Sequence, residues 1–228
     1  GELEPAAGMM EALGIADVMS LAAAPRLDQQ ARQLGIKPLF GLDARVLPWG
    51  ADDYDGEAYG LRLIAGDRSG WQRLVELVNT GGARAVDGAP AHLTWDEILE
   101  CPDGLIYLVG GFDSELTEAA SMGRVEIVEP MLEALISAAG AEQVFVALPS
   151  PATEDGAHAA KLLDTVAGHF GLPTVAAPDI ACALPEDDLA WRFWNGEGIQ
   201  PGAPTTMEHL ARPLAERAHL SGGELVAE

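Results

Sequence analysis

Positive charge is scarce in this sequence. Lysine and arginine together number 13, against 36 aspartate and glutamate residues, which gives a formal net charge of −23. A surface with this balance repels the phosphates of nucleic acids and of anionic lipids. We therefore expect no direct binding of nucleic acid by this chain and no membrane partner.

Cysteine is scarce as well, and long apolar runs are missing. Cys101 and Cys182 are the only cysteines and lie in unrelated contexts, which argues for a reducing compartment and against a disulfide framework. No stretch approaches the roughly 20 uncharged apolar residues that a membrane-spanning helix needs. The first residues form neither a basic nor an apolar targeting segment. These absences predict a soluble, cytoplasmic protein.

Apolar residues make up 48% of the 228 residues, which is enough to build a sizeable core. Short apolar runs, typical of strands, alternate with segments whose apolar residues recur at helical spacing. The expected strands cover residues 15–22, 37–46, 59–65, 105–109, 143–148 and 173–177, and the clearest helices cover residues 71–78, 128–136 and 159–170. This alternation predicts an α/β fold whose parallel strands are joined by crossover helices, either as an open sheet or as a barrel.

Two segments rich in Gly, Pro and Asp interrupt the alternation and are predicted to be surface loops, residues 47–57 and 80–93. The pattern after residue 185 is helical or irregular, and residues 207–220 favour a last helix. We expect a single domain over residues 1–228, with 206–228 as a terminal helical segment that could begin a linker to a following domain.

No familiar catalytic or cofactor motif is present. The five histidines form no H-x-H or H-x-x-x-H pair. The acidic segment around Asp53 places Arg62 where a calcium-binding loop of the EF-hand type requires a carboxylate. Gly196 and Gly198 begin a glycine-rich stretch that misses the dinucleotide-binding spacing by one residue. From these residues alone we expect no cofactor, no bound metal and no catalytic residue.

The order of several segments resembles the PHP (polymerase and histidinol phosphatase) domain at the start of the bacterial DNA polymerase III alpha subunit. The segments that carry the resemblance are Gly35-Ile-Lys-Pro-Leu-Phe-Gly41, Tyr59-Gly-Leu-Arg-Leu-Ile-Ala65, Asp103-Gly-Leu-Ile-Tyr-Leu-Val-Gly-Gly111 and Gly171-Leu-Pro-Thr-Val-Ala-Ala-Pro-Asp179. The resemblance implies a distorted βα barrel, either complete or without its first strand. In that family the strand ends bind two or three metal ions, and active members hydrolyse phosphoesters.

The resemblance also implies where metal ligands would lie, and few of them remain. The family's opening H-x-H would precede Gly1, and its Thr-Asp-His falls within residues 19–27, which contain neither Asp nor His. Two positions keep a carboxylate, Asp43 and Asp179. The other vestigial positions are Gly60, Gly111 and Ala181. Two carboxylates alone cannot form a catalytic metal site.

The leading hypothesis is therefore a degenerate, non-catalytic PHP domain that serves as a structural or protein-docking module in DNA replication. Its expected partners are the remainder of the polymerase and the proofreading exonuclease subunit. One alternative is an active metal-dependent phosphoesterase or 3′–5′ exonuclease whose ligands are completed outside this chain. Another is an unrelated α/β binding protein.

Loops held on a rigid scaffold often carry recognition, so we expect partner binding through Trp49 and Tyr54. The alternative is that Trp49 folds back onto its own barrel and the loop binds nothing.

Overall fold

The computed structural model describes residues 11–52, 56–85, 90–151 and 153–177. Six strands lie in this part of the chain: β1 (Ala12–Val18), β2 (Lys37–Val46), β3 (Tyr59–Ala65), β4 (Leu105–Gly110), β5 (Val144–Leu148) and β6 (Thr174–Ala176). The helices are α1 (Ala24–Leu34), α2 (Arg68–Gly82), α3 (Trp95–Glu100), α4 (Glu115–Ser121), α5 (Val125–Ala139) and α6 (Glu154–Phe170), with a short 3₁₀ turn, η1 (Ala141–Gln143).

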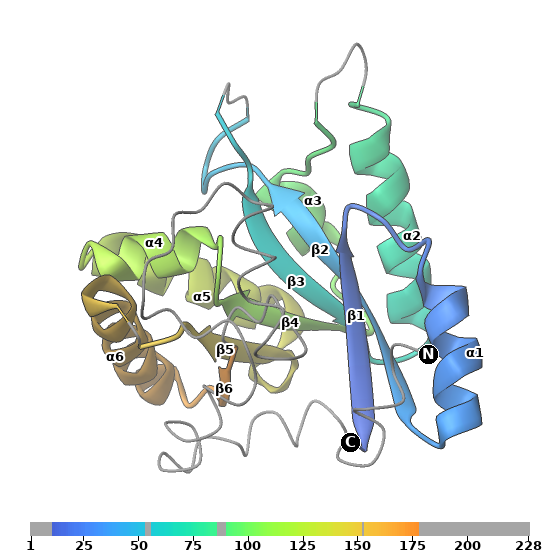
Figure 1. The fold of residues 1–228 in the computed structure, drawn as a ribbon. Coiled ribbons are helices and arrows are strands. Elements are labelled where there is room, and N and C mark those ends of the chain that lie inside the picture. Colours follow the sequence, from blue (N-terminus) through green and yellow to red (C-terminus); the bar gives the residue numbers. More distant parts are fainter. Residues whose placement is uncertain (1–10, 53–55, 86–89, 152, 178–228) are drawn as a thin grey trace, which may run out of the picture.

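The strands form one sheet in chain order, β1-β2-β3-β4-β5-β6 (Figure 1). The sheet curls into a half-barrel, which confirms the predicted class of a distorted βα barrel. One strand differs from the expected direction: β3 pairs antiparallel with both β2 and β4, whereas the other neighbours are parallel. A parallel return from β2 would need a crossover connection, and residues 47–52 of the link to β3 form no helix.

The direction of β3 decides which strand ends meet. The carboxyl ends of β1, β2, β4, β5 and β6 lie at the same edge of the sheet as the amino end of β3, because β3 alone runs the other way. We call this edge the mouth. In barrels built from βα units, functional groups gather at the carboxyl ends of the strands.

The core lies between the sheet and its helices. Alternate residues of the central strands, among them Leu42, Leu63 and Tyr107, are completely buried on the face that the helices cover. The phenol of Tyr107 donates a hydrogen bond to the carbonyl of Ile98 on α3 at 3.3 Å. Asp43 and Arg62 face each other across β2 and β3, so by the alternation of strands they lie on the opposite face, which lines the inside of the half-barrel.

Most predicted elements lie where the sequence places them, with shifted ends. The first strand begins and ends a few residues before the expected 15–22, and α2 continues through Gly82, so the following loop begins later than residue 80. Gly81 lets this last turn of α2 lie close to its neighbours, because a Cβ there would meet the carbonyl of His92 at 3.2 Å and the methyl of Met19. None of the helices in the described ranges is long and apolar enough to cross a membrane. The predicted terminal helix lies outside these ranges.

Candidate functional site

Three of the five predicted vestigial positions come together at the mouth. Asp43 lies near the carboxyl end of β2, Gly60 at the start of β3, and Gly111 directly after β4. A Cβ added to Gly60 would lie 3.1 Å from Oδ1 of Asp43. Gly111 lies close to Ala177, since its Cβ would be 3.6 Å from the methyl of Ala177. Asp179 and Ala181 lie outside the described residues.

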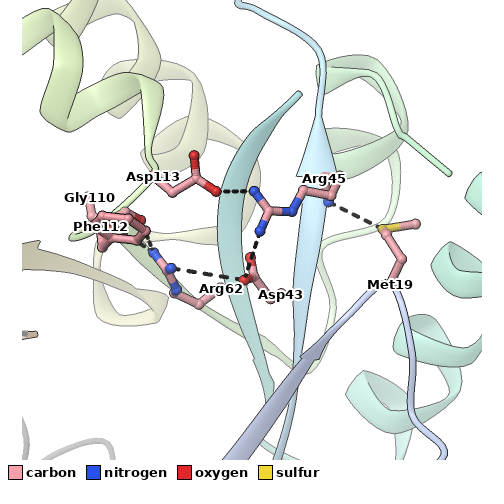
Figure 2. A network of polar contacts seen from close by, with 7 residues as sticks. All are labelled: Met19, Asp43, Arg45, Arg62, Gly110, Phe112 and Asp113. Carbon is pink, nitrogen blue, oxygen red and sulfur yellow. Dashed lines mark hydrogen bonds and ion pairs between the residues drawn. The ribbon is translucent and has the colours of Figure 1, made fainter. Parts of the chain in front are cut away.

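Two arginines that were not predicted to be site residues, Arg45 and Arg62, lie around Asp43 (Figure 2). Oδ2 of Asp43 is 3.5 Å from Nη2 of Arg45 and 3.9 Å from Nη2 of Arg62. Arg45 also forms an ion pair with Asp113. Side chains alternate between the two faces along a strand, so residues two apart share a face. Arg45 follows Asp43 by two residues and Arg62 follows Gly60 by two, and this spacing could have indicated that both arginines lie at the site. We call Asp43, Arg45, Arg62 and Asp113 the mouth network.

The mouth network fixes the loop between β4 and α4 in an unusual conformation. Gly110, Gly111 and Asp113 have φ values of 99°, 76° and 60°, a region that glycine adopts readily and other residues seldom do. Nη1 of Arg62 donates to the carbonyl of Phe112 at 2.6 Å, and the amide of Gly60 donates to the carbonyl of Asp113 at 2.6 Å. Side chains of two strands therefore hold a strained turn against the sheet.

Asp43 is incompletely compensated by these arginines. Its side chain is only 11% exposed, and Oδ1 is buried without a hydrogen-bond partner. Burial raises the pKa of the Asp43 carboxyl above its ordinary value, and the opposing effects of Arg62 and Arg45 do not cancel it. The two long charge–charge distances agree with this direction, because an ion pair contributes most when it is also a well-formed hydrogen bond.

These donors do not fit a metal cluster. In the described ranges no three His, Cys, Asp or Glu side chains converge to hold an ion. Asp43 is the one carboxylate at a predicted ligand position in this part of the chain, and its nearest charged neighbours are two guanidinium groups. A cation beside them would be repelled. The remaining predicted ligand segment, residues 19–27, contributes Met19, whose sulfur accepts from the amide of Arg45 at 3.2 Å.

Comparison with known protein families gives the identity of this fold. The profile described as "PHP domain" matches residues 6–150. The chain belongs to the PHP domain family. This membership agrees with the half-barrel.

Curated relatives of this PHP domain are polymerase subunits. It is 26% identical over 185 residues to DNA polymerase III subunit alpha of Thermus aquaticus, covering 78% of this chain and 15% of that protein. It is 29% identical over 174 residues to the same subunit of Escherichia coli K12, covering 75% of this chain and 14% of that protein. It is 27% identical over 223 residues to the Pseudomonas aeruginosa subunit, covering 92% of this chain and 18% of that protein. The chain thus spans less than a fifth of the length of these relatives.

The loop that follows β2 in this PHP domain packs against its own core. The indole of Trp49 lies edge-on to that of Trp95 on α3, with ring centroids 5.1 Å apart. The backbone amide of Trp49 donates to both carboxylate oxygens of Glu115 on α4, at 3.0 and 2.8 Å. This geometry matches the alternative in which Trp49 folds back, and partner binding through Trp49 stays a prediction. Tyr54 lies outside the described residues.

A pH dependence follows from two carboxyls of the PHP domain. Burial raises the pKa of Glu115 as well as that of Asp43 above their ordinary values of 4.5 and 3.8. Each of these two carboxyls therefore binds its proton more tightly in the folded state than in the unfolded state. Their contribution to stability is full below the ordinary values and is lost as the pH rises through the raised ones.

We expect the Asp43→Asn, Glu115→Gln double variant to lose stability less steeply than the wild type as the pH rises from the ordinary values of 3.8 and 4.5. Urea unfolding at a series of pH values at fixed ionic strength measures this slope. The control is Asp155→Asn, which changes an exposed carboxyl on α6 and should keep the wild-type slope. Identical slopes in the double variant and the wild type would contradict the prediction.

Proposed function

We propose that this chain is a degenerate, non-catalytic PHP domain that acts as a structural and protein-docking module of a replicative polymerase. The observation that carries the proposal is the placement of Arg45 and Arg62 beside Asp43, where the resemblance assigns metal ligands. Two cationic side chains lie beside the carboxylate that a metal cation would need as a ligand, which supports the proposal. A cytoplasmic location is part of the same proposal.

The chemistry of the mouth supports this reading. Hydrolysis assisted by a metal ion needs several converging ligands and an open position for water. At the mouth, glycine stands at two of the positions where the resemblance implies ligands, and a side chain at Gly60 would be crowded by its surroundings. Its Cβ would lie 3.1 Å from Asp43 Oδ1 and 3.2 Å from the carbonyl of Asp113. The surrounding contacts leave little room for the missing ligand.

The proposed partners follow from the relatives and from the charge. The relatives are named DNA polymerase III subunit alpha and are several times longer than this chain, so the remainder of such a polymerase is the first partner that we propose. The proofreading exonuclease subunit is the second. The net charge of −23 favours contacts with basic protein surfaces over contacts with nucleic acid.

One observation favours the alternative of an active phosphoesterase or exonuclease completed by ligands from outside this chain. Oδ1 of Asp43 is buried and has no hydrogen-bond partner, so one carboxylate oxygen at a predicted ligand position is available. The alternative requires that ligands from another chain or segment outweigh the repulsion by Arg45 and Arg62.

Metal content separates the two functions. We expect the chain, purified without chelator, to hold fewer than about 0.1 equivalents of Zn, Mn or Fe, because too few ligands converge. It should not hydrolyse a generic phosphoester, and neither Ala181→His nor Gly60→His should restore metal binding. Elemental analysis and a phosphoesterase assay with added Mn²⁺ or Zn²⁺ measure both properties. One or more equivalents of tightly bound metal would refute the proposal.

A further inference from the structure

The strained turn at the mouth holds an aromatic side chain in solvent. Phe112 is 59% exposed, although its carbonyl accepts from Arg62 and the next residue pairs with Arg45 (Figure 2). The backbone is thus fixed by the mouth network while the ring stays outside the core. A large, rigid aromatic group loses little conformational entropy on binding, which is why such residues dominate protein interfaces.

An acidic cavity adjoins this turn. It has a volume of about 260 Å³ and lies between the start of β3, α4 and the start of α6. Its lining includes three carboxylates, Asp113, Glu118 and Asp155, and contains no lysine or arginine. The hydroxyl oxygen of Thr117, which also lines the cavity, is buried and has no hydrogen-bond partner.

The charge of this cavity decides what kind of group it suits. The amino end of α6 alone would favour an anion, but Glu154 and Asp155 in its first turn offset that partial charge, and two more carboxylates line the cavity. A phosphate or a nucleic acid is therefore disfavoured. A lysine or arginine side chain suits the cavity, because the carboxylates of Glu118 and Asp155 can pair with it, while Asp113 already pairs with Arg45.

We propose that Phe112 and this acidic cavity form a docking surface for a short segment of another protein in which a lysine or arginine lies next to a large apolar residue. The basic side chain enters the cavity and the apolar residue covers the ring of Phe112. This combination of an apolar anchor and a charged neighbour is typical of interface hot spots. The inference rests on the proposed docking function and names its surface and the chemistry of its partner.

A random dodecapeptide library displayed on phage tests this surface. The library is selected on the wild-type chain. We expect enrichment of peptides with a lysine or arginine beside an aromatic or large aliphatic residue. The enriched consensus, made as a synthetic peptide, should bind Phe112→Ser and a Glu118→Lys, Asp155→Lys variant at least about tenfold more weakly than the wild type, and more weakly as salt increases.

Matched controls lie on other helices of the same domain. Val75→Ser removes an exposed apolar side chain from α2, and Glu133→Lys reverses an exposed charge on α5; both should bind the peptide as the wild type does. Thermal unfolding shows whether each variant is folded. If Phe112→Ser is not folded, binding of the peptide to the Glu118→Lys, Asp155→Lys variant tests the proposal.

Three results would overturn the proposal. They are the absence of an enriched consensus, an acidic or purely apolar consensus, and a consensus peptide that binds Phe112→Ser and the charge variant as tightly as it binds the wild type. The proposed function fails by a different measurement, which is stoichiometric metal in the wild-type chain.

Discussion

Replacing Arg62 by methionine is expected to lower the free energy of unfolding by about 2–4 kcal/mol. Methionine keeps most of the apolar stem of arginine but removes the guanidinium that lies near Asp43 and donates to the carbonyl of Phe112. Asp43 would then be buried beside one arginine instead of two, and the strained turn after β4 would lose a hydrogen bond at 2.6 Å. Urea unfolding followed by circular dichroism measures the loss.

Two further variants test the cause of this loss. Arg32→Met removes an exposed ion pair with Asp28 within α1 and should cost no more than about 0.5 kcal/mol. Asp43→Asn in the Arg62→Met background removes the uncompensated charge, so part of the lost stability should return. If Arg62→Met and Arg32→Met cost the same, the mouth network does not stabilise the half-barrel.

The positions of the mouth residues could be predicted from sequence more accurately than their interactions. The resemblance in segment order gave positions for Asp43, Gly60 and Gly111 on or directly after apolar runs that are typical of strands. In the structure, Asp43 lies near the end of β2, Gly60 at the start of β3 and Gly111 directly after β4. The resemblance could not show that Arg45 and Arg62 surround Asp43. Pairing between β2 and β3 brings Arg62 opposite Asp43, and that pairing depends on the direction of β3.

The direction of β3 was not predictable from the strand itself. Its apolar content is typical of a buried strand in either direction. The short helices α3 and α4 were also missed, because six and seven residues are too few to show a helical period. In α3 the capping box of Thr94 and Glu97 was a usable local signal. In α4, Ser114 makes no capping hydrogen bond through its side chain, so packing against α5 and α6 decides that helix.

The second large effect is expected at Trp49. Trp49→Ala should lower the free energy of unfolding by about 2–4 kcal/mol, because the indole packs against Trp95 and the hydrophobic core. The hydrogen bonds from the backbone amide of residue 49 to the carboxylate of Glu115 remain possible in the variant. The lost free energy of unfolding therefore reports on the side chain. Thermal and urea unfolding measure it.

The matched control for Trp49→Ala is Phe112→Ala, which removes an aromatic ring that is 59% exposed and should cost no more than about 0.5 kcal/mol. Co-purification of Trp49→Ala with a proofreading exonuclease subunit separates packing from recognition. Loss of stability in Trp49→Ala with retained binding means that the indole is part of the core and that docking lies elsewhere. Loss of binding at unchanged stability would instead establish the loop after β2 as the docking surface, and it would contradict the packing role argued from the contact with Trp95.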